Sequence, residues 1–229
     1  MRGEGSRAWL RRAAHSHPGP VRGRYDLRMT GGPSSWASTT HAWAAAVDHD
    51  HLRDVRERSA ELSGGSLRHL VLEVLAYAAD EAEALGRRGA CTVTLHPGGS
   101  VTVSDDGRGT DTRRDAQGDI VRKPVMSTED LRFFGADDAP LLADGRPRRG
   151  VSVVCGLSRW LVHTNRRADG AWTQRYEYGV PVTDLRPVES SGPTGTTVRF
   201  LPDATTITDT AVAPDDVRGL AWLDVTLSH

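Results

Sequence analysis

The segment from Leu67 to Gly86 constrains the fold of this chain more than any other stretch. Apolar residues recur along it at helical spacing, which predicts a helix with one continuous apolar face. The apolar face comprises Leu67, Leu70, Val71, Val74, Leu75, Ala78 and Ala82. The preceding sequence SGGS supplies Ser66 as an N-cap, and Gly86 and Gly89 end the helix. Such a helix needs a second layer of structure to cover its apolar face.

The sequence that follows the helix predicts this second layer. Residues 90–105 alternate between apolar and polar side chains on both sides of the turn PGG, a pattern typical of a β-hairpin. A short helix that continues into a strand is predicted for GVSVVCGLSRWLVHTNR. Two more strands are predicted for AWTQRYEYGV and GTTVRFLPD, and one strand or a short helix for residues 204–229.

Two further segments are predicted to be helical, namely residues 40–63 and Ser127–Phe134. The second has a loose capping pattern formed by Ser127 and Asp130. All these elements together predict an α+β fold. We expect a two-layer α/β sandwich, with helices packed on one face of a mixed, mainly antiparallel sheet.

The predicted domain spans residues 41–229. Residues 1–40 are rich in Arg, Gly, Ser and Pro and have no periodicity, so we expect a disordered or poorly ordered tail. Met29 is an alternative natural start to Met1. The N-terminal sequence is Arg-rich but lacks an apolar core segment, so it does not predict a secretory signal.

Charge and cysteine content exclude some function classes. The net charge of -1 gives no reason to expect direct binding to nucleic acid or to an anionic membrane. No apolar run approaches the roughly 18 residues of a membrane span. Cys91 and Cys155 are isolated in apolar contexts, which favours two buried free thiols in a reduced cytoplasm over the alternative of a disulfide. We therefore expect a cytoplasmic protein.

Three side chains of the central helix are spaced four residues apart and so share one face: His69, Glu73 and Tyr77. A carboxylate and a histidine in contact are a candidate acid/base pair. The plain alternative is a partly exposed helical pair that stabilises the helix by a few tenths of a kcal/mol. The sequence does not explain why a bulky phenol stands next to this pair.

Three segments in this order make the pattern specific: the helix SLRHLVLEVLAYAADEA, the strand end VTVSDDGRGT and the Thr/Gly turn TGTTVRF. Together with GVSVVCGLS and YEYGVP they resemble the ATP-binding domain of the gyrase B type, in the GHKL superfamily of gyrase, Hsp90, histidine kinases and MutL. The resemblance covers about residues 52–203. It implies the two-layer sandwich described above.

The resemblance also implies site residues. Glu73 would be the general base that activates the attacking water, and His69 would orient it. Asp105 would accept a hydrogen bond from the adenine amino group. The rest of the nucleotide pocket would be formed by Gly107, Gly109 and Thr196, with an ion pair between Glu81 and Arg108 at its rim.

The chain departs from the family where magnesium and triphosphate would bind. The resemblance implies an asparagine that holds Mg²⁺ where this chain has Tyr77, and a phenol is a poor ligand for this ion. The lid segment, ADGRPRRG at residues 143–150, keeps only Gly145 and Gly150 of a glycine-rich run, and Pro147 lacks an N–H. The sequence therefore predicts no metal site.

Three hypotheses remain open. In the first, ATP hydrolysis is lost and the old nucleotide pocket binds a small organic ligand without a required cofactor. Glu73, His69 and Tyr77 would then act as acid/base groups, as in a cyclisation or isomerisation in specialised metabolism. In the second, the chain binds ATP with Mg and is a weak ATPase that acts with a partner. In the third, it is a noncatalytic interaction or decoy module. Whether it is an enzyme, and whether it forms a homodimer, stays open.

Overall fold

The structure, a computed structural model, describes residues 47–229 except 112, 115–116, 118–119, 122–123, 137 and 190–191. The predicted tail, residues 1–40, lies outside the described residues, as do Met29 and the first part of the helical segment predicted for residues 40–63. The rest of that segment forms two helices, α1 (His49–Glu57) and α2 (Ser59–Ser63).

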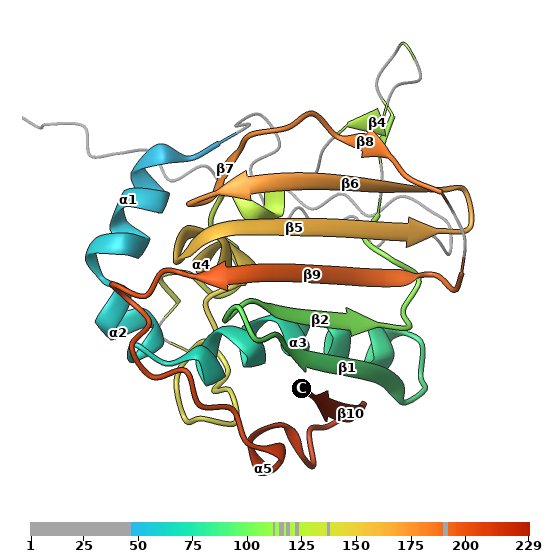
Figure 1. Cartoon of the computed structure of the whole chain (residues 1–229). Helices are drawn as coiled ribbons and strands as arrows, with labels where there is room; N and C mark the ends of the chain where they lie inside the picture. The colour runs from blue at the N-terminus through green and yellow to red at the C-terminus, as the bar shows by residue number, and fades with distance from the viewer. Residues whose placement is uncertain are drawn as a thin grey trace, which may run out of the picture. The chain divides into compact units, whose positions relative to one another are not determined.

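The main sheet has the strand order β10-β1-β2-β9-β5-β6-β7, and β8 also pairs with β6 (Figure 1). Its strands are β1 (Gly89–Leu95), β2 (Val101–Asp105), β5 (Ser158–Arg167), β6 (Gly170–Glu177), β7 (Val180–Pro181), β8 (Arg186–Pro187), β9 (Gly195–Pro202) and β10 (Leu223–Ser228). All pairs are antiparallel except β1 with β10. A separate small ribbon pairs β3 (Arg113–Arg114) with β4 (Ile120–Val121).

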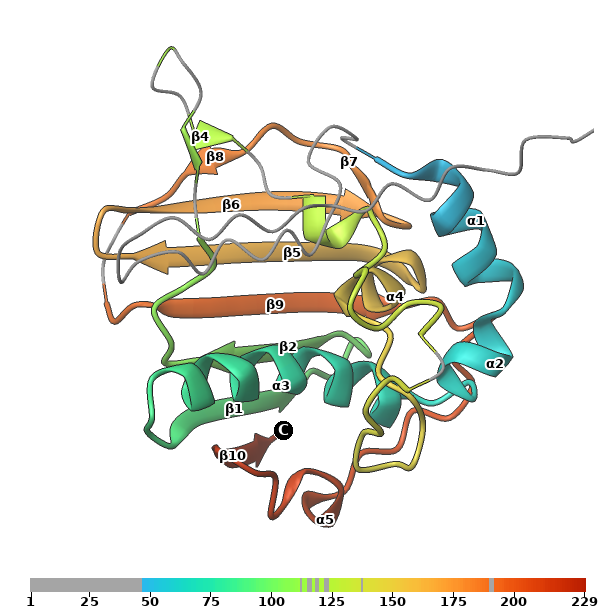
Figure 2. The same ribbon diagram turned by 180° about the vertical axis from the view of Figure 1, so that it is seen from behind.

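Helices α3 (Leu67–Ala84) and α4 (Val151–Gly156) pack on one face of this sheet (Figure 2). Helices α1 and α2 lie beside one end of the sheet strands (Figure 1), and α5 (Pro214–Val217) precedes β10 along the chain. A short 3-10 helix, η1, spans Pro124–Met126. The predicted two-layer α/β sandwich with a mixed, mainly antiparallel sheet is thereby confirmed.

The core lies between α3, α4 and the sheet. The apolar face predicted for α3 is buried, with exposed fractions of 8% or less for all seven of its residues. Facing it are sheet residues such as Val93, Val103, Leu161 and Phe200, each 2% exposed or less. Burying a side chain of this size stabilises the fold by about 1.5–3 kcal/mol. This apolar contact fixes which face of α3 points to the sheet.

Two local predictions are wrong. Ser127–Phe134 is not a helix: it follows η1 as a series of turns. The Ser127 hydroxyl donates to the Gly179 carbonyl, and the Asp130 side chain accepts from Tyr77, so the two expected caps serve tertiary contacts instead. Ser66 does precede α3, but its side chain makes no capping hydrogen bond and faces Asp209.

Both cysteines are buried free thiols, as predicted. Residues 204–229 contain both α5 and β10, where the sequence predicted one or the other. Within the described part of the chain, no helix combines the length and the apolar character that crossing a membrane requires.

Candidate functional site

Helix α3 places His69 and Glu73 inside the protein, each with an exposed fraction of 0%. His69 Nε2 lies 3.5 Å from Glu73 Oε1, so the predicted pair exists. The alternative of a partly exposed helical pair is wrong. A buried carboxylate must find partners for both its oxygens, because an unpaired buried charge is strongly destabilising.

The partners of Glu73 come from the lid segment. The backbone N–H of Arg149 donates to Oε1 at 2.6 Å, and that of Gly150 donates to Oε2 at 2.9 Å. Both carboxylate oxygens are therefore engaged by the chain itself. The lid segment also supplies Asp144, whose Oδ2 lies 2.8 Å from His69 Nδ1. Burial alone would lower the pKa of His69, but the hydrogen bond to Asp144 and the nearby carboxylate of Glu73 outweigh it and raise this pKa to about 9.

Tyr77 lies half-buried among charged side chains. Its hydroxyl donates to Asp130 Oδ2 at 2.6 Å, and burial raises its pKa above the ordinary value. Arg148 stacks over its ring, with the guanidinium carbon 4.7 Å from the ring centre. The same guanidinium binds both oxygens of Asp80, at 2.9 and 2.8 Å. The space around the phenol is thus filled by the protein's own charged groups.

Asp105 ends β2 beside the start of β9, because β2 and β9 are paired. Its Oδ1 accepts hydrogen bonds from the backbone N–H of Gly107, at 2.9 Å, and of Thr196, at 3.2 Å. Burial raises the pKa of Asp105. The structure thus brings together three residues that the sequence predicted for one site.

Gly107 and Gly109 follow Asp105 where side chains do not fit. A Cβ at Gly107 would lie 2.8 Å from Glu81 Cγ, and one at Gly109 would lie 2.6 Å from the Arg166 carbonyl oxygen. Gly109 also has a φ of +79°, which favours glycine. Both glycines therefore have structural reasons to be present.

The predicted ion pair between Glu81 and Arg108 is present. Arg108 Nε donates to Glu81 Oε1 at 2.6 Å and Nη2 donates to Oε2 at 3.1 Å. Burial would raise the pKa of Glu81, but the hydrogen bonds from Arg108 lower it more. This pair joins the end of α3 to the loop after β2.

No protein-family model matches the chain, but its sequence is similar to those of proteins whose family is known. It is 37% identical over 187 residues to the DNA gyrase B subunit of Haloferax volcanii, covering 76% of this chain and 29% of that protein. It is 36% identical over 172 residues to the DNA gyrase B subunit of Thermotoga maritima, covering 72% and 26%. This chain belongs to the gyrase-B-type family of ATP-binding domains.

A solved structure supports the fold of this gyrase-B-type domain. The topoisomerase IV ATP-binding domain of Francisella tularensis, in complex with a small-molecule inhibitor, superposes with a TM-score of 0.59 at 24% identity. The match covers 77% of this chain and 90% of that one. The chain spans about a quarter of the length of the curated relatives named above.

The candidate site has two ends, which we name after the roles that the resemblance implies. The base end comprises His69, Glu73 and Tyr77, and the protein's own side chains and lid segment contact it. The adenine end comprises Asp105, Gly107, Gly109 and Thr196. The crevice beside Asp105, which α3 and β1 also line, leaves no room for a water molecule. Among the described residues, no group of three or more His, Cys, Asp and Glu side chains could hold a metal ion.

Sequence reasoning missed the partners of the predicted residues. Asp130, Asp144 and Arg148 contact α3 from the loop region, more than 50 residues further along the chain. Asn165 of β5 was also missed: its side chain accepts from Thr110 N and donates to Thr110 O, each at 2.8 Å, next to Gly109. The one signal in the sequence was the run of arginines in the lid segment. It indicated side chains able to bind an anionic group, but not which carboxylates they contact.

Proposed function

We propose that this gyrase-B-type domain binds a planar, adenine-like heterocycle at Asp105 and does not hydrolyse ATP. The observation that carries the proposal is the state of Glu73. A general base must reach a water molecule, directly or through one intervening water. Glu73 is fully buried, and each of its two oxygens accepts a hydrogen bond from a backbone N–H of the lid segment, so the carboxylate is closed off from solvent.

The lid contacts also argue against a bound triphosphate. Backbone N–H groups that face a carboxylate cannot at the same time face a phosphate, and those of Arg149 and Gly150 face Glu73. Arg148 packs on the ring of Tyr77 and is already neutralised by Asp80. We therefore infer a ligand without a triphosphate, such as a nucleoside, and no required metal cofactor.

Recognition of the ligand would depend on Asp105. Its Oδ1 is held by two N–H groups, which orients the carboxylate, and Oδ2 accepts no hydrogen bond from the described residues. A carboxylate oxygen of this kind is a good acceptor for an exocyclic amino group. Because the crevice beside Asp105 has no room for a water molecule, ligand entry requires α3 and the loop after β2 to separate locally.

Acid/base chemistry on the ligand, the cyclisation or isomerisation predicted above, stays a prediction. Glu73 and His69 have the chemistry for proton transfer, but the lid segment separates them from any open space of the described structure. Weak Mg-ATP binding, favoured by the sequence identity to the gyrase relatives, is the competing function.

Calorimetric titration with adenosine, ADP and Mg-ATP tests the proposal. We expect adenosine to bind with an affinity that magnesium does not change, and Asp105→Asn to weaken it at least tenfold. Asp224→Asn is the control, because Asp224 is an exposed carboxylate of β10 that pairs with Arg88 and does not line the crevice. Binding of Mg-ATP that is far tighter than adenosine, with release of phosphate, would overturn the proposal.

A further inference from the structure

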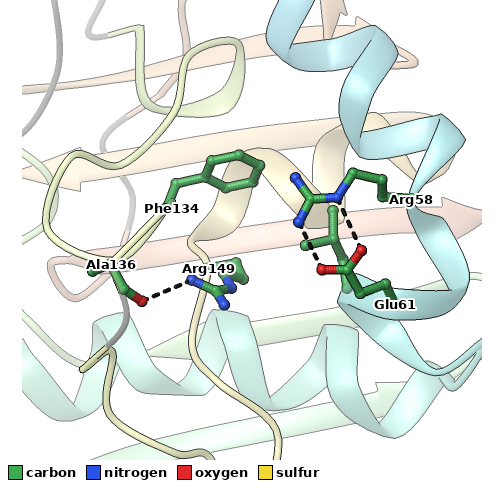
Figure 3. A pocket seen from close by; sticks show the side chains of 7 residues that line it. Arg58, Glu61, Phe134, Ala136 and Arg149 are labelled. Carbon is green, nitrogen blue, oxygen red and sulfur yellow. Dashed lines mark hydrogen bonds and ion pairs between the residues drawn. The ribbon is translucent and has the colours of Figure 1, made fainter.

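A second cavity lies apart from Asp105. It has a volume of about 320 Å³, within the range of small-molecule sites (Figure 3). Arg58, Glu61 and Leu62 of the α1–α2 region line one side, and Phe134, Ala136 and Arg149 line the other. Glu73 and Asp105 do not line this cavity.

The two arginines of this cavity differ in their partners. Arg58 is neutralised by its hydrogen bonds to Asp54, at 2.9 Å, and Glu61, at 2.7 and 3.0 Å. Arg149 Nη1 donates only to the backbone carbonyls of Phe133 and Ala136, at 2.8 and 3.3 Å. No carboxylate among the described residues forms an ion pair with Arg149. The guanidinium of Arg149 therefore faces the cavity without a direct ion pair to a described residue, and the one carboxylate on the cavity wall, Glu61, is already bonded to Arg58.

The donors of Arg149 are arranged for a planar anion. With Nη1 held by two carbonyls, its guanidinium is fixed in position, and Nε and Nη2 remain as the adjacent pair of donors. Such a pair matches the two oxygens of a carboxylate. The ring of Phe134 supplies a small apolar surface beside it, with Leu62, 4% exposed, behind. Glu61 on the opposite wall disfavours a second negative charge on the ligand.

We propose that this cavity binds a small organic monoanion, a carboxylate with a compact apolar or aromatic body. The carboxylate lies on Nε and Nη2 of Arg149, and the apolar body lies against Phe134. This site is separate from the adenine end and does not depend on the function proposed there.

Binding at this cavity also acts on the base end, because both sites use Arg149. The backbone N–H of Arg149 contacts Glu73, while its side chain lines the cavity. Arg146, in the same lid segment, donates to the Glu61 carbonyl at 3.2 Å. A ligand between α2 and the lid segment therefore adds to the contacts that hold the lid segment over Glu73.

Benzoate is a suitable probe, with benzyl alcohol as its neutral analogue. At constant ionic strength we expect saturable benzoate binding by calorimetry and a rise in the unfolding midpoint with benzoate concentration. Benzyl alcohol should bind at least tenfold more weakly. Inorganic phosphate, which is largely a dianion near pH 8, should also bind more weakly, and tighter binding of phosphate would overturn the assignment to a monoanion.

Variants locate the probe. Arg149→Gln keeps the backbone N–H on Glu73 but removes the charge, and we expect benzoate affinity to fall at least tenfold. Arg53→Gln is the control, because Arg53 is an exposed arginine of α1 outside the cavity. Ala136→Trp leaves Arg149 in place and fills the cavity, so it should also abolish binding, and circular dichroism checks that each variant is folded. Equal benzoate affinity in folded Arg149→Gln or Ala136→Trp would overturn the proposal.

Discussion

The base end and the adenine end of the site differ in what satisfies their carboxylates. At the adenine end, Asp105 keeps one oxygen without a partner among the described residues, and its neighbours hold the backbone close. At the base end, both oxygens of Glu73 and the histidine beside it are paired with the lid segment. The two carboxylates thus differ in their contacts: one oxygen of Asp105 has no partner among the described residues, and both oxygens of Glu73 fasten the lid segment to the core.

Under the function proposed above, this difference is the way in which the pocket changes its role without a change of fold. A buried carboxylate and a histidine are costly unless they are paired. When the lid segment supplies those partners from its own backbone, the same residues become stabilising contacts. We expect the base end to respond to substitution mainly through stability and the adenine end mainly through binding.

The largest effect is expected for Glu73→Ala. It leaves the N–H groups of Arg149 and Gly150 buried without an acceptor and removes a partner of His69, so the free energy of unfolding should fall by about 3–5 kcal/mol. Urea unfolding measures this. Glu83→Ala, an exposed position on the same helix, should change it by less than about 0.5 kcal/mol. Equal effects of the two variants would mean that the lid contacts do not stabilise the fold.

Gly109→Ala tests the adenine end for a structural role. The substitution combines a φ of +79° with contacts to Asn165 and Arg166, so we expect a loss of about 2–4 kcal/mol. Gly86→Ala is the matched control, because Gly86 has a φ of +64° but no atom within 4 Å of the added Cβ. The difference between the two variants in urea unfolding isolates the steric part. If the two variants lose the same free energy, the loop after β2 can shift away from Asn165 and Arg166, and the predicted steric role of Gly109 is wrong.

The pH dependence of stability should reveal the charge on His69. Its pKa is about 9 in the folded protein and about 6.5 when unfolded, so its stabilising effect is complete below pH 6.5 and is lost as the pH rises through 9. The loss is about 3 kcal/mol at most.

Urea unfolding between pH 6 and 9.5, compared with His69→Gln, measures this loss. The buried thiols of Cys91 and Cys155 also titrate in the unfolded chain over this range, so the difference in slope between the two proteins reports His69. Parallel slopes would show that His69 is neutral in the folded protein.

The smallest effect is expected for Arg108→Ala. Arg108 is more than half exposed, and an exposed ion pair contributes about 0–1 kcal/mol. Thermal unfolding should therefore change little, while adenosine titration shows whether the rim affects the ligand. A loss above about 2 kcal/mol would place this pair among the main stabilising contacts and weaken the contrast between the two ends.

The sequence predicted elements whose pattern is local. The period of apolar residues in α3 and the alternation in β1 and β2 arise from the element's own geometry, so they were read correctly. Ser127–Phe134 failed for the opposite reason: its capping residues are used by distant groups, the Gly179 carbonyl and the Tyr77 hydroxyl. Local propensity does not predict a hydrogen-bond partner that lies so far along the chain.

The same limit applied to the site. The spacing of His69 and Glu73 predicted their contact, because four residues on a helix bring side chains together. It could not predict that Arg149 and Gly150 would bind Glu73, because backbone N–H groups carry no residue-specific signal. The surroundings of Tyr77 were also out of reach, because its partners Asp130 and Arg148 lie more than 50 residues further along the chain.

The two buried cysteines offer a way to follow each end of the site without adding a label. Cys91 lines the crevice beside Asp105, and Cys155 lies in α4, directly after the lid segment. Burial raises the pKa of both thiols, that of Cys91 to about 12, so neither reacts readily with an alkylating agent while its surroundings stay closed. Trapping with iodoacetamide, followed by mass spectrometry of each cysteine peptide, would thus time the opening of the two ends separately within one unmodified chain.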